Sequence, residues 1–343
     1  MKGRQVTIKD IARQLGISPS TVSRALKDHP DISNETKKAV TELAQKLKYQ
    51  PNVLALSLQS AKSNTIGVII PEIVHFFFSS VISGIEDVAQ KEGFTVMICQ
   101  SNESYEREVS NAQALFAHRV DGVLVSISKE TTNYDHLNFF LENEIPLGFF
   151  DRKGRDIEAD AVLINDFQSA YIATSHLIET GHRRIAHLTG PLTLTICSER
   201  LRGYCKALED HEIEVDKELI VNADNMEMGA VQIKDLLSHP VPPDAIFAVN
   251  DNTAVGAMRA IIEAGLRVPE DIAVVGFSDG RIARLTTPTL TSVDQKGFEM
   301  GKEAAKLLIE RIQHSQIEIP PRLKVLDGEL IIRESSTTKN KKN

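Results

Sequence analysis

Residues 7–26, TIKDIARQLGISPSTVSRAL, encode two short helices around a tight turn. One face of the first helix is marked by the i, i+3, i+4, i+7 spacing of Ile8, Ile11, Ala12 and Leu15. Thr7 stands where this helix would be capped, and Gly16 stands where it would end. Ser18 can cap the second helix, and Pro19 then takes its first position, where a missing amide N–H costs nothing. The stretch therefore predicts a helix-turn-helix.

The second of these helices carries hydroxyl groups and one guanidinium on its polar side, from Ser20, Thr21, Ser23 and Arg24. Short hydroxyls can hold phosphates, and an arginine can donate two hydrogen bonds to guanine. A third helix is expected from Ser33 or Asn34 to about Lys48, because Val40, Leu43, Ala44 and Leu47 share one face. The competing interpretation is a helical hairpin whose polar face binds nothing.

Charge is distributed unevenly along the chain. Residues 1–63 contain 11 Lys+Arg and 5 Asp+Glu, a net charge of +6. The remaining 280 residues have a net charge of −14, which gives −8 for the whole chain. Neutralisation of phosphates is the main sequence-independent contribution to DNA affinity. A basic segment at one end of an acidic protein therefore favours the DNA-binding interpretation.

Length and composition limit the remaining classes. A chain of 343 residues with 42% hydrophobic content can fill two or three cores. It contains no apolar run of eighteen residues and no signal-peptide core after Met1, so we expect a cytoplasmic protein without a membrane partner. The three cysteines and the pair His182 and His187 fit no metal spacing, and neither a Walker loop nor a G-x-G-x-x-G motif occurs. We expect neither a metal nor a cofactor.

Beyond residue 64, apolar runs alternate with helical stretches. The runs are residues 65–70, 94–99, 122–125, 145–150, 184–188, 245–249 and 272–277. Continuous apolar runs are typical of strands buried on both faces of a parallel sheet. They form two series, which predicts two doubly wound lobes with a ligand cleft at the carboxyl ends of their strands.

Short motifs now make the interpretation specific. They are TVSR at 21–24, YQPN at 49–52, IGVIIP at 66–71, DGV at 121–123, FDR at 150–152, GHRRI at 181–185, RLRGY at 200–204, ND at 250–251 and VVGF at 274–277. In this order and at these spacings, the chain resembles the LacI family of bacterial transcription regulators along nearly its whole length. The resemblance implies lobes of the periplasmic-binding-protein type. It also implies a homodimer that reads a pseudo-palindromic operator in double-stranded DNA.

The resemblance also divides the chain. Residues 1–50 would form an all-α helix-turn-helix DNA-binding domain and residues 51–63 a hinge helix and linker. Residues 64–337 would form an α/β effector-binding and dimerisation domain, followed by a basic tail at 338–343. The first lobe is expected at about 64–162 plus 294–322, and the second at about 163–293 plus 323–337.

Roles at the DNA follow from the same resemblance. It assigns the base contacts to Pro19, Ser20 and Arg24. It assigns the phosphate contacts to Thr7, Ser18, Thr21, Ser23, Tyr49 and Asn52. Because Pro19 offers only apolar contact, for example with a thymine methyl, Ser20 and Arg24 must supply most of the direct readout.

The segment after Asn52 is a run of good helix formers that is too short to hold a helix alone in water. In the family, this segment orders on operator DNA, pairs with its dimer mate and wedges a leucine into the minor groove. Leu58 matches that leucine, and Ala55 is assigned to the same minor-groove hinge. The alternative is that Leu54, Leu56 and Leu58 pack on the body.

For the cleft, the resemblance implies effector contacts at Phe77, Phe78, Asp151, Arg200, Asn250 and Ser278. Carboxylate, amide and guanidinium groups can bind sugar hydroxyls, and aromatic faces can cover a ring, so we expect a sugar or sugar derivative. The competing interpretations are that Arg200 only pairs with an acid and that both phenylalanines belong to the core. A ligand that changes the angle between the lobes would then control the hinge, either as an inducer or as a corepressor.

The repressor function has two alternatives. A solute-binding receptor would share the two lobes but would need neither the basic head nor gene regulation. A hydrolase would use Ser278 in GFSDG at 276–280, which matches the G-x-S-x-G motif. The residues after it offer at most two helical turns before Pro288, instead of the long helix that a nucleophile elbow requires. We therefore do not expect an enzyme.

Overall fold

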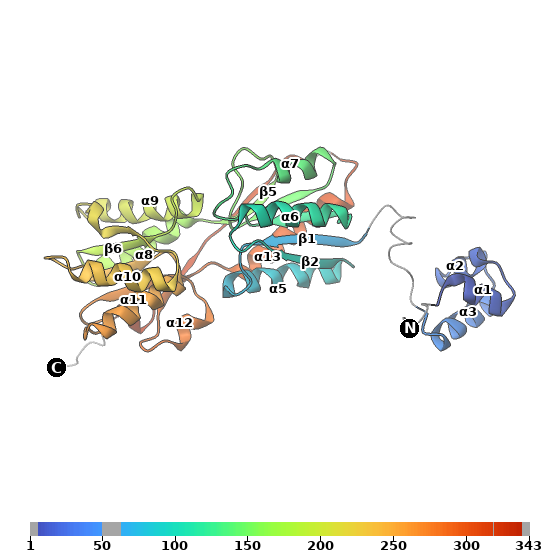
Figure 1. The fold of residues 1–343 in the computed structure, drawn as a ribbon, viewed down its shortest axis with the longest axis horizontal. Helices are drawn as coiled ribbons and strands as arrows, with labels where there is room; N and C mark the ends of the chain where they lie inside the picture. Colours follow the sequence, from blue (N-terminus) through green and yellow to red (C-terminus); the bar gives the residue numbers. More distant parts are fainter. Residues whose placement is uncertain (1–5, 50–62, 318, 338–343) are drawn as a thin grey trace. The chain divides into compact units, whose positions relative to one another are not determined.

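The computed structural model describes residues 6–49, 63–317 and 319–337 (Figure 1). The chain separates into two compact units, Met1–Ser63 and Asn64–Asn343. Several expectations lie outside the described residues. They concern the hinge residues Asn52, Ala55 and Leu58, their neighbours Leu54 and Leu56, and the basic tail at 338–343.

The first unit has the predicted helix-turn-helix, formed by α1 (Ile8–Leu15) and α2 (Pro19–Leu26) and followed by α3 (Asn34–Lys46). Thr7 begins α1 by donating from its backbone N (3.0 Å) and its hydroxyl (2.7 Å) to the Asp10 carboxylate. Gly16 ends the helix in the left-handed region at φ 66°. Ser18 caps α2 by accepting a hydrogen bond from the backbone N of Thr21 at 3.1 Å. These local interactions confirm the start and stop signals in the sequence.

A small core holds the three helices together. Its buried members are Ile11, Ala12, Val22, Ala25, Val40 and Ala44. Val40 and Ala44 come from α3, so the third helix completes a core that the first two could not form alone. The expected apolar faces are confirmed.

The first lobe of the second unit is an α/β layer built on one six-stranded sheet. Its order is β11-β5-β4-β3-β1-β2, and all its strand pairs are parallel. The elements are β1 (Thr65–Ile70), α5 (Phe76–Lys91), β2 (Thr95–Gln100), α6 (Tyr105–Ala117), β3 (Gly122–Val125), α7 (Asp135–Glu142), β4 (Leu147–Phe150), β5 (Asp160–Ile164), α13 (Gly297–Gln313) and β11 (Leu323–Leu326).

The second lobe repeats this plan with the order β12-β10-β9-β8-β6-β7, in which only β12 runs antiparallel to its neighbour. Its elements are α8 (Asp166–Glu179), β6 (Ile185–Thr189), α9 (Thr195–Asp210), a 3-10 turn (Lys217–Leu219), β7 (Ile220–Asn222), α10 (Met226–Leu237), β8 (Ala245–Ala248), α11 (Asp251–Glu263), β9 (Ala273–Ser278), α12 (Arg281–Leu285), β10 (Thr291–Asp294), β12 (Glu329–Ile331) and a second 3-10 turn (Glu334–Ser336).

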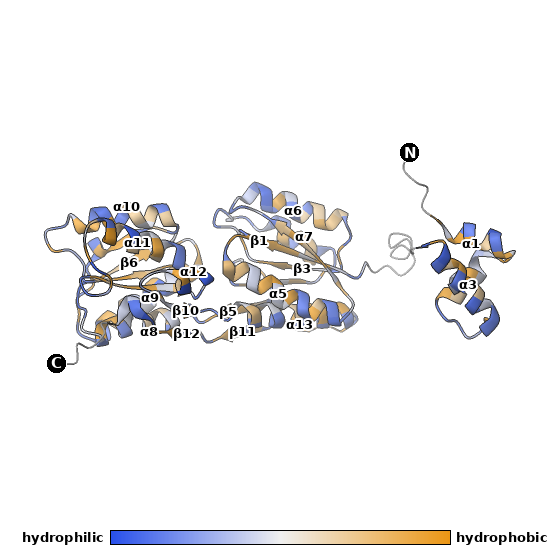
Figure 2. Ribbon diagram, turned by 90° about the horizontal axis from the view of Figure 1, so that it is seen from below, coloured by the Kyte–Doolittle hydropathy of each residue, from blue (hydrophilic) through white to orange (hydrophobic). Residues whose placement is uncertain are grey.

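Helices cover both faces of each sheet (Figure 1). In the first lobe, α5 and α13 pack on one face and α6 and α7 on the other. In the second lobe, α10 and α11 cover one face and α8 and α9 the other. Figure 2 shows apolar strands inside and polar outer helix faces in both lobes. Two doubly wound lobes are therefore confirmed. None of the described helices combines the length and apolar character needed to cross a membrane.

The structure corrects expectations about the strands and about the lobe boundaries. Strand β2 is an edge strand with exposed or half-buried residues, so its apolar run does not indicate burial on both faces. Five strands were not predicted from the sequence: β5, β7, β10, β11 and β12. Because β11 pairs with β5, residues 323–326 belong to the first lobe and not to the second as expected, and the crossover lies between β11 and β12. The first lobe likewise extends through Ile164.

Candidate functional site

The exposed surface of α2 contains the three residues expected to contact bases. Pro19, Ser20 and Arg24 are exposed, whereas Thr21 and Ser23 are half-buried beside them. The hydroxyl of Ser18 lies 2.7 Å from that of Ser20 and 2.8 Å from that of Thr21. The cap therefore also orients two hydroxyls expected at the DNA.

Arg24 differs from these hydroxyls because its side chain has no partner within the part of the chain that the structure describes. Among the described residues it makes neither an ion pair nor a side-chain hydrogen bond, so its guanidinium is available for another molecule. Thr7 is exposed at the start of α1. Tyr49 is half-buried against the head core, and desolvation raises the pKa of its hydroxyl.

The six expected effector residues line one cleft between the two lobes, with a volume of about 440 Å³. They come from widely separated elements, namely Phe77 and Phe78 of α5, Asp151 after β4, Arg200 of α9, Asn250 before α11 and Ser278 at the end of β9. The carboxyl ends of parallel strands meet at one edge of a sheet, which explains why these positions converge. The cleft is the place where a doubly wound protein binds small molecules.

Asp151 is a buried hydrogen-bond acceptor in this cleft. Asp151 directly follows β4, has a backbone φ of 61° and is only 4% exposed. Its carboxylate accepts a hydrogen bond from the Ser126 hydroxyl at 3.3 Å. Desolvation raises the pKa of its carboxyl. A carboxylate has room for about four hydrogen bonds, so Asp151 can also accept from a ligand.

Arg200 forms the ion pair that the sequence analysis gave as one alternative, while contact with an effector stays a prediction. Its Nε donates to Asp166 at 2.7 Å and its Nη1 to the backbone oxygen of Val249 at 2.7 Å. Its guanidinium carbon lies 3.7 Å from the ring centroid of Phe277, and the residue is 3% exposed. Burial raises the pKa of Asp166 to about 6 although the arginine opposes this shift. Arg200 thus lines the cleft while it holds a buried ion pair.

Asn250 and Ser278 are also held in place by protein partners. The Asn250 carboxamide accepts from the backbone N of Thr253 at 2.8 Å and donates to the backbone oxygen of Asp224 at 2.8 Å. The Ser278 hydroxyl donates to Gln295 at 2.7 Å. Its described hydrogen bond is thus to an amide and not to a histidine, and the following helix α12 has only five residues. This arrangement is unlike that of a hydrolase nucleophile.

Phe77 and Phe78 are buried in the core of the first lobe and also line the cleft. Their ring centroids are 5.2 Å apart at an interplanar angle of 65°. An edge-to-face pair is rigid and can present one aromatic wall to a ligand ring. The core interpretation is therefore confirmed, and contact of these rings with an effector stays a prediction.

Several cleft residues were not anticipated from the sequence. Lys129 of the first lobe pairs with Asp224 of the second at 3.2 Å, and Arg152 pairs with Glu103 at 2.8 Å. Gln295, which holds Ser278, follows the unrecognised strand β10. For the charged residues, the available signal was their position in loops after strands; neutral Gln295 gave none.

Beside the cleft, Asp251 is the buried first residue of α11. Its carboxylate accepts from the Ser292 hydroxyl at 2.5 Å and from the backbone N of Gly280 at 2.6 Å. Burial raises its pKa to about 7, with a smaller contribution from nearby Asp279 and opposition from Arg333. The folded protein therefore holds a proton that the unfolded chain releases near pH 4. This stabilisation is present at low pH and is lost as the pH rises through 7, by up to about 1.4 kcal/mol per pH unit.

We expect Asp251→Asn to flatten this pH dependence. An asparagine can accept from Gly280 and donate to Ser292, so the packing is retained without the titrating group. Thermal unfolding between pH 5 and pH 8 should show the variant gaining stability relative to the parent as the pH rises. Asp235→Asn, at an exposed site, is the matched control and should leave the slope unchanged. Parallel curves for Asp251→Asn and the parent would contradict the assignment.

Neither histidine of the rejected metal pair has metal-site surroundings. His187 is stacked between Tyr204 and Phe247, and burial lowers its pKa to about 4. His182 lies 3.7 Å from Asp244. Over the described ranges, no three histidine, cysteine or acidic side chains gather in a metal-binding arrangement.

Comparisons with known families match both units. The model for bacterial regulatory proteins of the lacI family matches residues 7–52, and that for a periplasmic binding protein-like domain matches residues 174–336. The HTH-type transcriptional repressor PurR of Actinobacillus pleuropneumoniae is 33% identical over 336 residues, which cover 98% of this chain and 99% of the relative.

Solved structures match over similar lengths. The lac repressor dimer bound to operator and the anti-inducer ONPF has a TM-score of 0.87 at 27% identity, covering 98% of this chain and all of that one. The complex of the transcriptional regulator CelR with cellobiose has a TM-score of 0.74 at 30% identity, covering 96% of this chain and all of that one. The similarity thus spans head and body alike.

Proposed function

The chain belongs to the lacI family of bacterial regulatory proteins, and on this premise we propose that occupancy of its cleft controls how its head binds operator DNA. It is a DNA-binding transcriptional repressor regulated by a small molecule, and not an enzyme. The partners are double-stranded operator DNA, an effector and a second copy of the chain. The cytoplasm is the compartment where such a repressor meets its DNA.

The observation that carries this proposal is the convergence of six side chains from both lobes on one cleft. A ligand that contacts both lobes binds one relative angle of the lobes more tightly than another, and so shifts their equilibrium. The segment at 51–63 joins the body to the head, and we assign to it the minor-groove contact of Leu58 and Ala55. A solute-binding receptor would have the cleft without the helix-turn-helix.

We propose a sugar or sugar derivative as the effector class. Asp151, Arg200 and Asn250 offer the carboxylate, guanidinium and amide groups that bind hydroxyls, and Phe77 offers an aromatic wall. The related regulator CelR has been solved as a complex with cellobiose. Thermal-shift screening first identifies a ligand of the body. Operator affinity measured with and without that ligand then tests whether the cleft controls DNA binding. A ligand that stabilises the body but leaves operator affinity unchanged would contradict it.

At the DNA, we propose that Pro19, Ser20 and Arg24 contact bases. The proposed phosphate contacts are Thr7, Ser18, Thr21, Ser23, Tyr49 and Asn52. Support comes from the exposed polar side of α2 and from the guanidinium of Arg24, which has no partner among residues 6–49 and the described body.

We expect Arg24→Ala to cost about 1–3 kcal/mol of operator binding and to relax the preference at one base pair. The reason is that a bidentate contact to guanine discriminates against other bases. Titrations against single-base-pair variants of a selected operator measure both effects. Arg13→Ala removes an exposed arginine of α1 and is the control, because loss of a general charge should weaken all sequences equally. An unchanged preference in Arg24→Ala would refute the assignment.

A further inference from the structure

The cleft continues beyond the six residues described above. A second hollow of about 720 Å³ adjoins the central cleft of about 440 Å³. Both are lined by Lys129, Asp151, Arg152, Leu194 and Ile196. Because these side chains face both spaces, a ligand held by Asp151 can extend into the second hollow without leaving the cleft. A single ring in the central cleft would leave the larger space unused.

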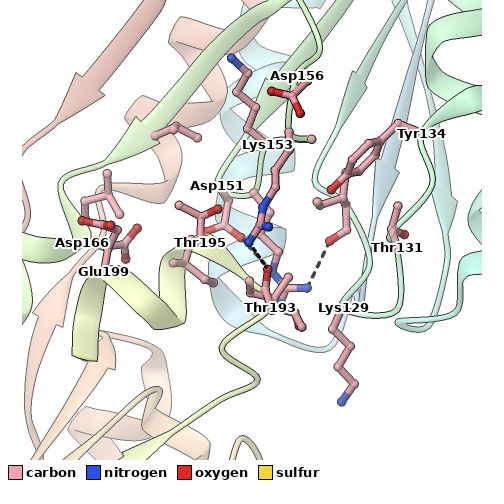
Figure 3. Close-up of a pocket in the computed structure, with 18 of the residues that line it drawn as sticks. Lys129, Thr131, Tyr134, Asp151, Lys153, Asp156, Asp166, Thr193, Thr195 and Glu199 are labelled. Carbon is pink, nitrogen blue, oxygen red and sulfur yellow. Dashed lines mark hydrogen bonds and ion pairs between the residues drawn. The ribbon is translucent and has the colours of Figure 1, made fainter. Parts of the chain in front are cut away.

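The walls of the second hollow belong to both lobes (Figure 3). Tyr134, Lys153 and Asp156 lie on the side of the first lobe, and Thr193 and Thr195 lie at the start of α9 in the second. Hydroxyl, amine and carboxylate groups supply both donors and acceptors, and Tyr134 adds an aromatic ring. This mixture suits a polyhydroxylated ligand, whose hydroxyls both donate and accept.

Charge in the central cleft disfavours an anionic ligand, because each cation already has a carboxylate partner. Lys129 pairs with Asp224 at 3.2 Å, Arg152 with Glu103 at 2.8 Å and Arg200 with Asp166 at 2.7 Å. A phosphate or carboxylate would have to displace one of these partners. The second hollow is balanced as well, with four cations and four carboxylates among its lining residues: Lys129, Arg152, Lys153 and Arg155 against Asp151, Asp156, Asp166 and Glu199.

We propose that the effector is a neutral oligosaccharide of at least two sugar rings. One ring lies against Phe77 and Phe78 with its hydroxyls on Asp151, and the next lies in the second hollow between Tyr134 and Thr193. The inference rests on the proposed function, in which the effector binds between the lobes. The inference specifies how large that effector is and that it carries no net charge. The Arg155 guanidinium donates to the backbone oxygen of Thr193 at 3.3 Å and so links the two lobes beside the second hollow.

Calorimetric titration of the full-length protein tests the ligand class. The neutral disaccharides cellobiose, maltose, lactose, trehalose and sucrose are compared with glucose, galactose, fructose, glucose 6-phosphate and guanine. At least one disaccharide should bind about tenfold or more tightly than each of its own monosaccharides. Tighter or equal binding of a monosaccharide, the sugar phosphate or guanine would overturn the inference, as would the absence of binding by all five disaccharides. A monosaccharide or guanine that altered operator affinity would overturn only this inference and would leave the proposed function standing.

A hollow-filling variant tests the location. Thr193→Trp places bulk in the second hollow only, since Thr193 is exposed and does not line the central cleft. Binding of the disaccharide hit should weaken about tenfold or more, while operator binding without effector and the unfolding temperature stay unchanged. Thr180→Trp, at an exposed threonine of the same lobe outside both hollows, is the control. Equal disaccharide affinity in Thr193→Trp and the control would show that the second hollow is not used.

Discussion

Deleting residues 1–63 is expected to abolish specific operator binding and to leave the effector-binding body folded. The boundary follows the division between the two compact units, and the body keeps both sheets and all six proposed effector residues. The deleted segment carries the +6 charge, whereas the body carries −14 and repels phosphates. Loss of at least about 10³-fold in affinity is expected, since specific and non-specific binding commonly differ by that factor or more.

The experiment uses DNA that the full-length protein selects from a randomised pool. Operator affinity is measured by electrophoretic titration at two salt concentrations, because phosphate contacts make binding salt-dependent. Thermal shift with the same effector hit reports the integrity of the body. A truncated body that binds the selected DNA as tightly as the full chain would disprove the division of labour proposed here.

Replacing Arg200 with methionine is expected to destabilise the body by about 3–5 kcal/mol, because it leaves the Asp166 carboxylate buried without a partner. It also removes the hydrogen bond to Val249 and the contact with Phe277. Loss of the opposing guanidinium raises the pKa of Asp166 further. A raised carboxyl pKa favours the folded state at low pH, so the destabilisation should be smaller at pH 5 than at pH 8.

Urea unfolding at these two pH values measures the effect. Arg202→Met is the matched control on the same helix, because Arg202 forms an exposed pair with Glu199 that contributes at most about 1 kcal/mol. Asp166→Asn in the Arg200→Met background should recover part of the lost stability. An Arg200→Met variant as stable as Arg202→Met would show that the buried pair does not hold α9 against α8.

The head is the part of the protein most completely predicted from sequence. Thr7, Gly16 and Ser18 act on backbone groups only a few residues away, so local chemistry decides where α1 and α2 begin and end. The buried strands β1, β3, β8 and β9 were also predicted, because continuous apolar runs are typical of strands that helices cover on both faces of a parallel sheet.

Prediction failed where pairing partners are distant in the chain. Strand β11 is only four residues long and mostly exposed, and its lobe is decided by pairing with β5 about 160 residues earlier. Strand β2 has the apolar sequence of a central strand but lies at an edge. Neither strand position follows from a local pattern, because the position of a strand in a sheet depends on which other strands form hydrogen bonds with it.

The sequence by itself determined the class of the protein and its basic head, and its family resemblance named six of the residues that line the central cleft. Only the tertiary structure decided that Lys129 meets Asp224, that Arg200 is committed to Asp166 and that the cleft opens into a second hollow beside Thr193. The physical reason is that helix signals and apolar runs act over a few residues. Ion pairs and cavities instead depend on the packing of two lobes whose chain crosses between them three times.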